Sequence, residues 1–350
     1  MGTLRVWVLV GAILVPGLGC GTGAGAGAVA VTDAAATDQN AEADAAANDD
    51  AANDSAQGDA VEGDTASADA DAATSDAAPA CTPSPRASAP QELGGARPAP
   101  VFLPKAWDGC TRYPLVILLH GYSASGGVQD AYLGFSARVD SQGFVLVVPE
   151  GTMAPNNNQF WNATDACCDF YGQKIDDVSY LRGLIDAAVK SLAVDPERVY
   201  LFGHSNGGFM AYRMACEASD VVTGITSLAG AVVGKASLCT PSRPVHVLQI
   251  HGTNDATIGY DGGALFPSAQ QAVQRWRDLN ACEGEPLAGG PFDYDSAVTG
   301  AETAEQRWKT CAQGVEVGLW TMKGSKHIPG INDAFRDAAL KWLLAGRRTP

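Results

Sequence analysis

Basic side chains are missing from a long N-terminal part of this chain. The 350 residues include 23 Lys and Arg, but none lies between Arg5 and Arg86, whereas residues 31–80 hold 13 of the 39 Asp and Glu. The net charge of −16 therefore arises largely from this acidic segment. Recognition of nucleic acid needs a clustered basic face. The sequence shows none, so we expect no nucleic-acid partner.

Large apolar side chains are scarce in the same part of the chain. From residue 21 to about residue 95, the sequence consists mainly of Ala, Asp, Gly, Ser and Thr. A segment of this composition cannot bury enough apolar surface to offset the entropy lost on ordering. We therefore expect residues 21–95 to form a disordered linker and residues 96–350 to form one folded domain.

The apolar stretch at the N-terminus is too short to span a bilayer. It follows Arg5 and covers residues 6–15, whereas a membrane-spanning helix needs about 20 apolar residues. This pattern predicts a signal peptide over residues 1–20. Leu18-Gly19-Cys20 suggests a lipoprotein cleavage site with lipid on Cys20; ordinary cleavage near residues 28–30 is the alternative. Either route predicts an exported protein, extracellular or at the cell surface, that touches a membrane only through such a lipid.

Cysteine, by contrast, is abundant. The chain has nine cysteines, and lipidation or removal of Cys20 leaves an even number. An even count in an exported chain favours disulfide bonds. We expect two local pairings, Cys216 with Cys239 and Cys282 with Cys311, because each joins a helix end to the approach to a nearby strand.

Two further cysteines, Cys167 and Cys168, are adjacent in the sequence. We expect them to bond elsewhere, to Cys110 and Cys81. A metal site would need more Cys or His around the pair, and the neighbouring sequence offers none.

Short apolar runs alternate with helical patterns from about residue 96 onward. Near-continuous Val, Leu and Ile runs are typical of a parallel sheet that helices cover on both faces. The sequence therefore predicts one α/β domain. Strands are expected at 114–119, 144–149, 199–202, 224–229, 245–250 and 315–320, and helices over about 178–192, 206–217, 268–281 and 331–344.

A serine stands where one strand pattern changes into a helical pattern, in Gly203-His204-Ser205-Asn206-Gly207. Sites of open α/β sheets form at the carboxyl ends of strands. A sharp strand-to-helix turn holds the serine in strained backbone angles, and glycine two positions to each side relieves the crowding. The pattern predicts that Ser205 is a nucleophile.

A serine nucleophile needs a base, and elimination among five histidines indicates His327. His204 lies inside the turn and His246 inside a strand. His120 and His251 each end a strand before glycine and are expected to order loops. His327 follows the last strand and precedes the last helix, where α/β-hydrolases carry their base.

An acid should follow a strand between the nucleophile and the base. The segment after the 245–250 strand offers Asp255 and Asp261. Asp255 is better placed to reach back, whereas Asp261 precedes Gly262-Gly263 and resembles a turn residue. We therefore favour Asp255.

Acyl transfer also needs two N–H donors for the oxyanion. Asn206 follows the nucleophile directly and is expected to supply one of them. The loop after the 114–119 strand should supply the other, with Tyr122 the favoured donor; an ordinary turn residue is the alternative.

Five segments carry a resemblance to a known family. They read "LLHGYSASG", "WNATDACCDFYGQKIDDVSYLRGLID", "VDPERVYLFGHSNGGFMAYRMACE", "PVHVLQIHGTNDATIGYDGG" and "GSKHIPG". The chain resembles the esterase/polyhydroxybutyrate depolymerase family of the α/β-hydrolase superfamily, which includes feruloyl esterases and acetylxylan esterases of carbohydrate esterase family one. The resemblance implies Ser205 as nucleophile, Asp255 as acid and His327 as base, and disulfides such as Cys216–Cys239 and Cys282–Cys311.

One departure from the family concerns the wall of the acyl pocket. Family members often carry a tryptophan in an H-x-W-P-G run, whereas this chain has Ile328 directly after His327 and no tryptophan there. Phe160, Trp161 and Tyr171 are expected to line the pocket, because aromatic walls suit an aryl acyl group. Packing of these rings in the core is the alternative.

Together these features predict an exported serine carboxylesterase that needs no cofactor and acts as a monomer. Feruloyl or acetylxylan-type esters of plant polysaccharide are the favoured substrates, because "GHSNGG" looks more like the feruloyl esterases. A polyhydroxybutyrate depolymerase is the first alternative. A serine peptidase and an inactive surface-binding lipoprotein are the others.

Overall fold

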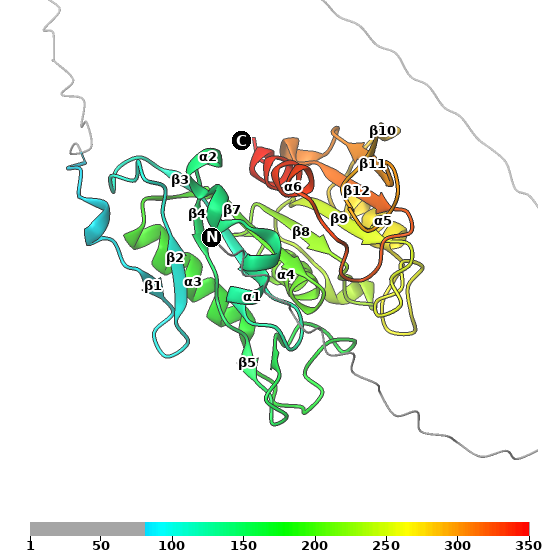
Figure 1. The fold of residues 1–350 in the computed structure, drawn as a ribbon, viewed down its shortest axis with the longest axis horizontal. Coiled ribbons are helices and arrows are strands. Elements are labelled where there is room, and N and C mark those ends of the chain that lie inside the picture. The colour runs from blue at the N-terminus through cyan, green and yellow to red at the C-terminus, as the bar shows by residue number, and fades with distance from the viewer. Residues whose placement is uncertain (1–80, 350) are drawn as a thin grey trace, which may run out of the picture. The chain divides into compact units, whose positions relative to one another are not determined.

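The computed structural model describes residues 81–349, which form a mixed ten-stranded sheet with helices on both faces (Figure 1). The strands are β1 Glu92–Leu93, β2 Ala99–Phe102, β3 Tyr113–Leu119, β4 Val145–Val147, β7 Val194–His204, β8 Gly224–Leu228, β9 His246–Gly252, β10 Leu287–Phe292, β11 Thr303–Trp308 and β12 Val317–Met322. They lie in the order β1-β2-β4-β3-β7-β8-β9-β12-β11-β10. A separate hairpin pairs β5 (Thr152–Met153) with β6 (Gln159–Phe160).

The central strands β4, β3, β7, β8, β9 and β12 run parallel and correspond to the six apolar runs of the sequence. In β3 every residue except Tyr113 is buried, because helices cover both faces. The antiparallel strands β1, β2, β10 and β11 lie at the two edges and were not predicted. None of the β10 residues is buried, so that edge strand needs no apolar run.

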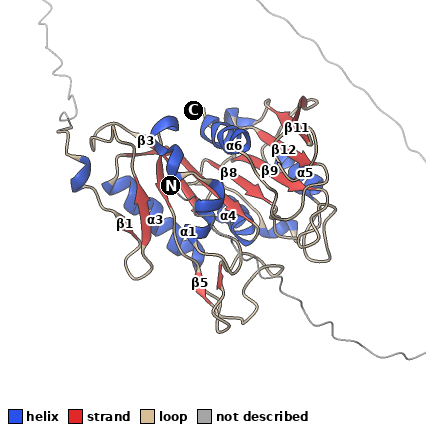
Figure 2. Ribbon diagram, viewed as in Figure 1, coloured by secondary structure: helices blue, strands red, loops and turns tan. Residues whose placement is uncertain are grey.

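The helices divide between the two faces of the sheet (Figure 2). They are α1 Gly126–Leu133, α2 Val139–Gln142, α3 Asp177–Ser191, α4 Asn206–Glu217, α5 Ala269–Leu279 and α6 Asp333–Ala345, with 3-10 turns at Arg86–Ser88, Ser136–Arg138, Ala236–Leu238 and Ala312–Gly314. Helices α3, α4 and α5 bury side chains such as Leu181, Phe209 and Trp276 in one core layer. Helices α2 and α6, with the end of α1, bury Val139, Phe335 and Leu133 in the other.

Two acidic residues begin α3 and have different roles. The side chain of Asp176 caps the helix by accepting a hydrogen bond from the Ser179 N–H. Asp177 is buried and forms an ion pair with Arg97 at 2.8 Å, while its other oxygen accepts from the Asn162 N–H at 2.8 Å. Both carboxylates therefore serve the structure around the loop that precedes α3.

The described structure begins earlier than the domain boundary expected at residue 96. Residues 81–95, which the sequence placed in the linker, include β1, and Glu92 and Leu93 pair with Pro100 and Ala99 of β2. A disulfide also joins Cys81 to Cys110. The composition of this segment does not reveal these contacts, because strands pair through their backbones and need no large side chain for it. The signal peptide, Cys20 and most of the linker lie outside the described residues.

Four disulfides are present in residues 81–349. The two local pairings expected from the sequence, Cys216–Cys239 and Cys282–Cys311, are found. The expectation that Cys167 and Cys168 bond to Cys110 and Cys81 is wrong. Cys167 and Cys168 bond to each other and are buried in the loop between β6 and α3. Cys81 instead lies beside the 108–110 turn, where Ser84 N–H donates to the Asp108 carbonyl at 2.8 Å.

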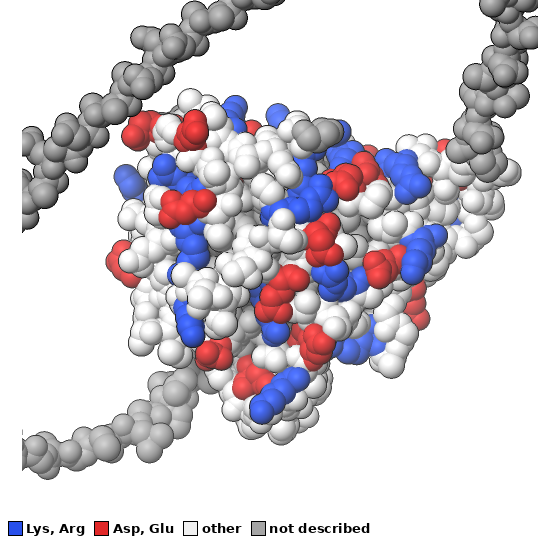
Figure 3. Space-filling view, turned by 180° about the vertical axis from the view of Figure 1, so that it is seen from behind, with Lys and Arg blue, Asp and Glu red and all other residues white. Residues whose placement is uncertain are grey.

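Charged side chains of both signs are interspersed on the described part of the face in Figure 3, and neither sign forms a continuous patch there. Among the described residues, ion pairs join side chains of opposite charge, such as Arg182 with Asp220 at 2.5 Å. Within residues 81–349, no helix has the length and apolar character needed to cross a membrane.

Candidate active site

Ser205 occupies the sharp turn between β7 and α4. Its φ of 53° and ψ of −119° are strained for a residue with a side chain. A Cβ on Gly203 would overlap the Gly207 carbonyl, and a Cβ on Gly207 would overlap the Leu119 carbonyl. Glycine is therefore required on both sides of the serine, which is left partly exposed at the carboxyl edge of the sheet.

Ser205, Asp255 and His327 meet at this edge, each following a different parallel strand. The Ser205 hydroxyl lies 2.9 Å from His327 Nε2, and His327 Nδ1 lies 2.7 Å from Asp255 Oδ2. The other oxygen of Asp255 accepts from the N–H groups of Thr257 and Ile258, both at 2.8 Å. The alternative acid, Asp261, is exposed in a turn.

The environment of Asp255 keeps its carboxylate charged. Burial opposes ionisation, but hydrogen bonds from His251 and His327 outweigh this cost, so the pKa of Asp255 lies well below its usual range. A buried carboxylate that accepts from Nδ1–H holds the His327 ring with Nε2 free to accept the serine proton.

The loop that carries His327 is held from two sides. His204 Nε2 donates to the His327 carbonyl at 3.0 Å, and the Tyr132 hydroxyl donates to the Pro329 carbonyl at 2.7 Å. Burial lowers the pKa of His204 to about 4, so this ring is neutral near pH 7. Gly330 N–H also donates to Asp295 at 2.7 Å, which ties the same loop to the segment after β10.

The peptide between Gly121 and Tyr122 is held in one orientation. His120 Nδ1 donates to the Gly121 carbonyl at 2.8 Å, while His120 Nε2 accepts from the Gly151 N–H at 2.8 Å. Because C=O and N–H of a trans peptide point in opposite directions, this contact also directs the Tyr122 N–H. Gln129 further accepts from the Gly121 N–H at 3.2 Å. Burial lowers the pKa of His120 and favours this neutral form.

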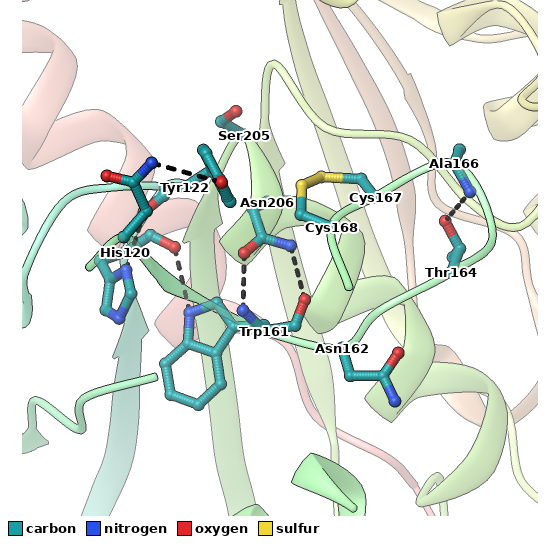
Figure 4. The surroundings of a disulfide bond; sticks show 12 residues. His120, Tyr122, Trp161, Asn162, Thr164, Ala166, Cys167, Cys168, Ser205 and Asn206 are labelled. Carbon is teal, nitrogen blue, oxygen red and sulfur yellow. Dashed lines mark hydrogen bonds between the residues drawn. A yellow bond between two sulfur atoms is a disulfide. The ribbon is translucent and has the colours of Figure 1, made fainter. Parts of the chain in front are cut away.

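Two backbone N–H groups are available beside the serine. Within residues 81–349, neither the Tyr122 N–H nor the Asn206 N–H has a hydrogen-bond acceptor in the protein. Both polar atoms of the Asn206 side chain are hydrogen-bonded: its oxygen accepts from the Trp161 N–H at 2.7 Å and its nitrogen donates to the Trp161 carbonyl at 2.9 Å (Figure 4). These bonds tie the start of α4 to the loop after β6.

The expectation that Phe160 and Trp161 line a substrate pocket is wrong. Their exposed fractions are 1% and 0%, and the Trp161 indole N–H donates to the His120 carbonyl at 3.1 Å. These rings belong to the core because they pack behind the loops that carry Tyr122 and Asn206. Tyr171 is 51% exposed.

The aromatic residue Phe170 was not predicted from the sequence. It is 64% exposed, and its ring meets the Tyr122 ring edge to face, with 5.3 Å between centroids. The Tyr122 hydroxyl accepts from the side-chain amides of Asn156 and Asn158 at 3.1 and 3.3 Å. Its position next to Tyr171 in the sequence could have suggested Phe170 as a pocket residue. The contact with Tyr122 could not be predicted, because the two loops lie far apart in the sequence.

Comparison with known proteins identifies the family of this chain. The sequence profile of the phospholipase/carboxylesterase family matches residues 110–286. Feruloyl esterase B of Piromyces equi is 28% identical over 243 residues, which cover 66% of this chain but only 42% of that protein. A protein of Nocardia uniformis subsp. tsuyamanensis named putative esterase NocK is 31% identical over 241 residues, or 65% of this chain and 69% of that protein.

A solved structure supports the fold. An acetyl xylan esterase from Aspergillus awamori matches with a TM-score of 0.53 at 12% identity, covering 72% of this chain and 98% of that chain. The likeness at this identity concerns the fold alone. With its mainly parallel sheet, this is an α/β-hydrolase fold, and the chain belongs to the phospholipase/carboxylesterase family.

Proposed function

We propose that this protein is an exported serine carboxylesterase that uses Ser205, His327 and Asp255 as a catalytic triad. The observation that carries the proposal is the continuous chain of contacts, 2.9 Å from Ser205 to His327 and 2.7 Å from His327 to Asp255. These residues come from three separate loops, and the contacts match the donors and acceptors that nucleophilic acyl transfer requires.

In the proposed first step, the Ser205 hydroxyl oxygen attacks the ester carbonyl carbon while its proton passes to His327 Nε2. Asp255 stabilises the imidazolium that forms. The Tyr122 and Asn206 N–H groups donate to the oxyanion, a contribution of about 10²–10³ in turnover for each donor. The carbon–oxygen bond to the alcohol then breaks, and the alcohol leaves with the proton from His327.

In the second step, water replaces the alcohol. His327 takes a proton from water, whose oxygen attacks the acyl carbon, and the same N–H groups stabilise the second oxyanion. Collapse releases the carboxylic acid and returns the proton to Ser205. Every proton is accounted for by these residues and the substrate, and the proposed cycle has no metal or cofactor step.

We infer that the acyl group is aromatic or that the ester is attached to plant polysaccharide. The exposed rings of Phe170 and Tyr171, with Tyr122 beside the serine, offer aromatic surface to an aryl group. The similarity to feruloyl esterase B supports the same class. Ile328, 57% exposed directly after His327, offers an aliphatic contact next to the proposed base.

Export is part of this proposal. Four disulfides in residues 81–349 suit an oxidising compartment, outside the cell or at its surface. Lipid attachment at Cys20 and a monomeric state stay predictions from the sequence.

The test is ester hydrolysis by the full exported chain with its disulfides formed. The panel holds methyl ferulate, acetylated xylan, p-nitrophenyl acetate and 3-hydroxybutyrate oligomers. We expect hydrolysis of ferulate or acetylxylan, and a loss of at least about 10³-fold in Ser205→Ala. Ser141→Ala, at an exposed serine of α2, is the matched control and should keep full activity.

Other outcomes separate the alternatives. Hydrolysis of hydroxybutyrate oligomers alone would replace the polysaccharide esters by a polyester. Full activity in Ser205→Ala would overturn the proposed triad. The same holds if the wild-type protein hydrolyses none of the esters.

A further inference from the structure

A buried chain of polar side chains continues from Asp255 away from the serine. His251 Nε2 lies 3.3 Å from Asp255 Oδ2 and donates to the Ile258 carbonyl at 2.8 Å. His251 Nδ1 lies 2.9 Å from Gln249 Nε2, and the Tyr212 hydroxyl lies 2.8 Å from Gln249 Oε1. Tyr212 and Gln249 are fully buried and His251 is 1% exposed. The carboxylate of Asp255 therefore lies between two imidazoles.

The hydrogen bonds around Gln249 determine the form of His251. The Tyr212 hydroxyl and the Gly230 carbonyl fix the amide, because the hydroxyl donates to Oε1 while Nε2 donates to the Gly230 carbonyl at 2.9 Å. The second hydrogen on Nε2 then points at His251 Nδ1, which must accept it. His251 therefore carries its one proton on Nε2, where it faces the Ile258 carbonyl and Asp255.

We propose that His251 is a positioning residue that Gln249 and Tyr212 hold in the tautomer with its proton on Nε2. This N–H donates to the Ile258 carbonyl and also lies 3.3 Å from Asp255 Oδ2, so it stabilises the Asp255 carboxylate and leaves the negative charge of Asp255 to His327. The inference rests on the proposed triad. A second proton on His251 would sit on Nδ1, where it would clash with the Gln249 N–H, and it would place a cation beside Asp255. That cation would offset the negative charge that stabilises protonated His327.

Titratable groups face His251 from each neighbouring element. Asp255 lies on the loop after β9 itself, and Tyr260 from the same loop packs edge to face against the His251 ring, with its hydroxyl bonded to Thr321 of β12. Tyr212 reaches in from α4, and burial raises the pKa of its hydroxyl, so it stays a neutral donor.

Two further histidines lie on the far side of Asp255. His204, at the end of β7, and His327, after β12, have ring centroids 5.3 Å apart. The carboxylate of Asp255 lies beside the His251 ring, with Oδ2 3.3 Å from His251 Nε2.

The experiment compares the pH dependence of kcat/KM, with methyl ferulate or p-nitrophenyl acetate, for the wild type and three variants. His251→Gln keeps a donor in the place of Nε2, whereas His251→Leu removes it. Gln249→Glu replaces the amide donor by a carboxylate that favours a protonated His251.

We expect opposite shifts of the acid limb. In Gln249→Glu the His251 cation would lie next to Asp255, whereas the new carboxylate lies beyond His251, so the nearer cation should move the limb to lower pH by about half a unit. In His251→Leu, Asp255 loses the polar N–H that lies beside Oδ2 and acts on His327 alone, so the limb should move to higher pH. His251→Leu should also lose about 10–100-fold in kcat with KM unchanged, while His251→Gln should recover most of this loss.

A merely structural role predicts a different result. It would lower the melting temperature and the amount of active enzyme and leave the acid limb of every variant at the wild-type pH, and that outcome would overturn the proposal. If the buried carboxylate of Gln249→Glu prevents folding, Tyr212→Phe replaces that variant. It keeps the core volume but removes the hydroxyl that fixes the Gln249 amide, so we expect a smaller shift of the acid limb toward lower pH. If the proposed triad itself is wrong, Ser205→Ala would keep its activity, and this result separates that case from a failure of the His251 proposal.

Discussion

Asp255 and Asp261 are a matched pair for testing the proposed acid. Asp255 contacts His327 and is 6% exposed, whereas Asp261 is exposed in a turn of the same loop. In Asp255→Asn the amide cannot stabilise the imidazolium and favours the wrong tautomer of His327, so kcat should fall by about 10⁴. Asp261→Asn should keep its activity. Equal activity of the two variants would contradict the assignment of Asp255 as the acid of the triad.

His246 determines part of the pH dependence of stability. It is buried, donates from Nε2 to the Trp342 carbonyl at 3.1 Å and accepts at Nδ1 from the Glu316 N–H at 3.1 Å. Burial lowers its pKa to about 3 and that of His204 to about 4. The unfolded chain, with histidine pKa values of about 6.5, therefore takes up protons first as the pH falls.

We expect the free energy of unfolding to be highest above about pH 6.5 and to decrease as the pH falls toward about 4. Denaturant unfolding measured at several pH values checks this. The slope should be smaller in His246→Gln, which keeps a donor for the Trp342 carbonyl but does not titrate. An unchanged slope in this variant would show that the folded protein accommodates the His246 cation.

At the scale of elements, the start of α4 tolerates no side chain at Gly207. A Cβ there would overlap the Leu119 carbonyl, whereas a Cβ on Gly183 in α3 would meet nothing within 4 Å. Gly207→Ala should cost several kcal/mol or prevent folding, and Gly183→Ala should stabilise by about 0.5–1 kcal/mol because alanine favours the helix. Chemical denaturation of both variants measures the contrast. Equal effects would show that the turn can shift.

The elements that the sequence predicted share a local signature. Helix α4 has the bounds expected from the sequence. The glycines around Ser205 indicate where it begins, and the apolar periodicity indicates how long it is. The edge strands β10 and β11 were not predicted because they pair through their backbones and lack an apolar run. Two glycines and a proline interrupt β10, and mainly polar residues separate the two buried ends of β11.

At the scale of the whole molecule, disulfides connect elements that the sheet already brings near each other. The Cys282–Cys311 bond links the residues after α5 to those after β11 and spans 29 residues. Replacing both cysteines by serine should lower the free energy of unfolding by about 2–4 kcal/mol, because the unfolded chain regains loop entropy. Cys167 and Cys168 are one residue apart, so the same replacement there should cost less. A larger loss at the adjacent pair would mean that native packing, not loop closure, dominates.

The α/β class and the six parallel strands could be predicted from the amino-acid sequence, and the three residues proposed as the triad were candidates on the same basis. These features leave local marks: apolar runs, glycines beside a strained serine, and short lists of histidines and aspartates after strands. Three features became visible only in the folded chain: Phe160 and Trp161 are buried, Cys167 pairs with Cys168, and Phe170 contacts Tyr122. Burial and contact between distant loops depend on how the whole chain packs, and no short segment encodes them.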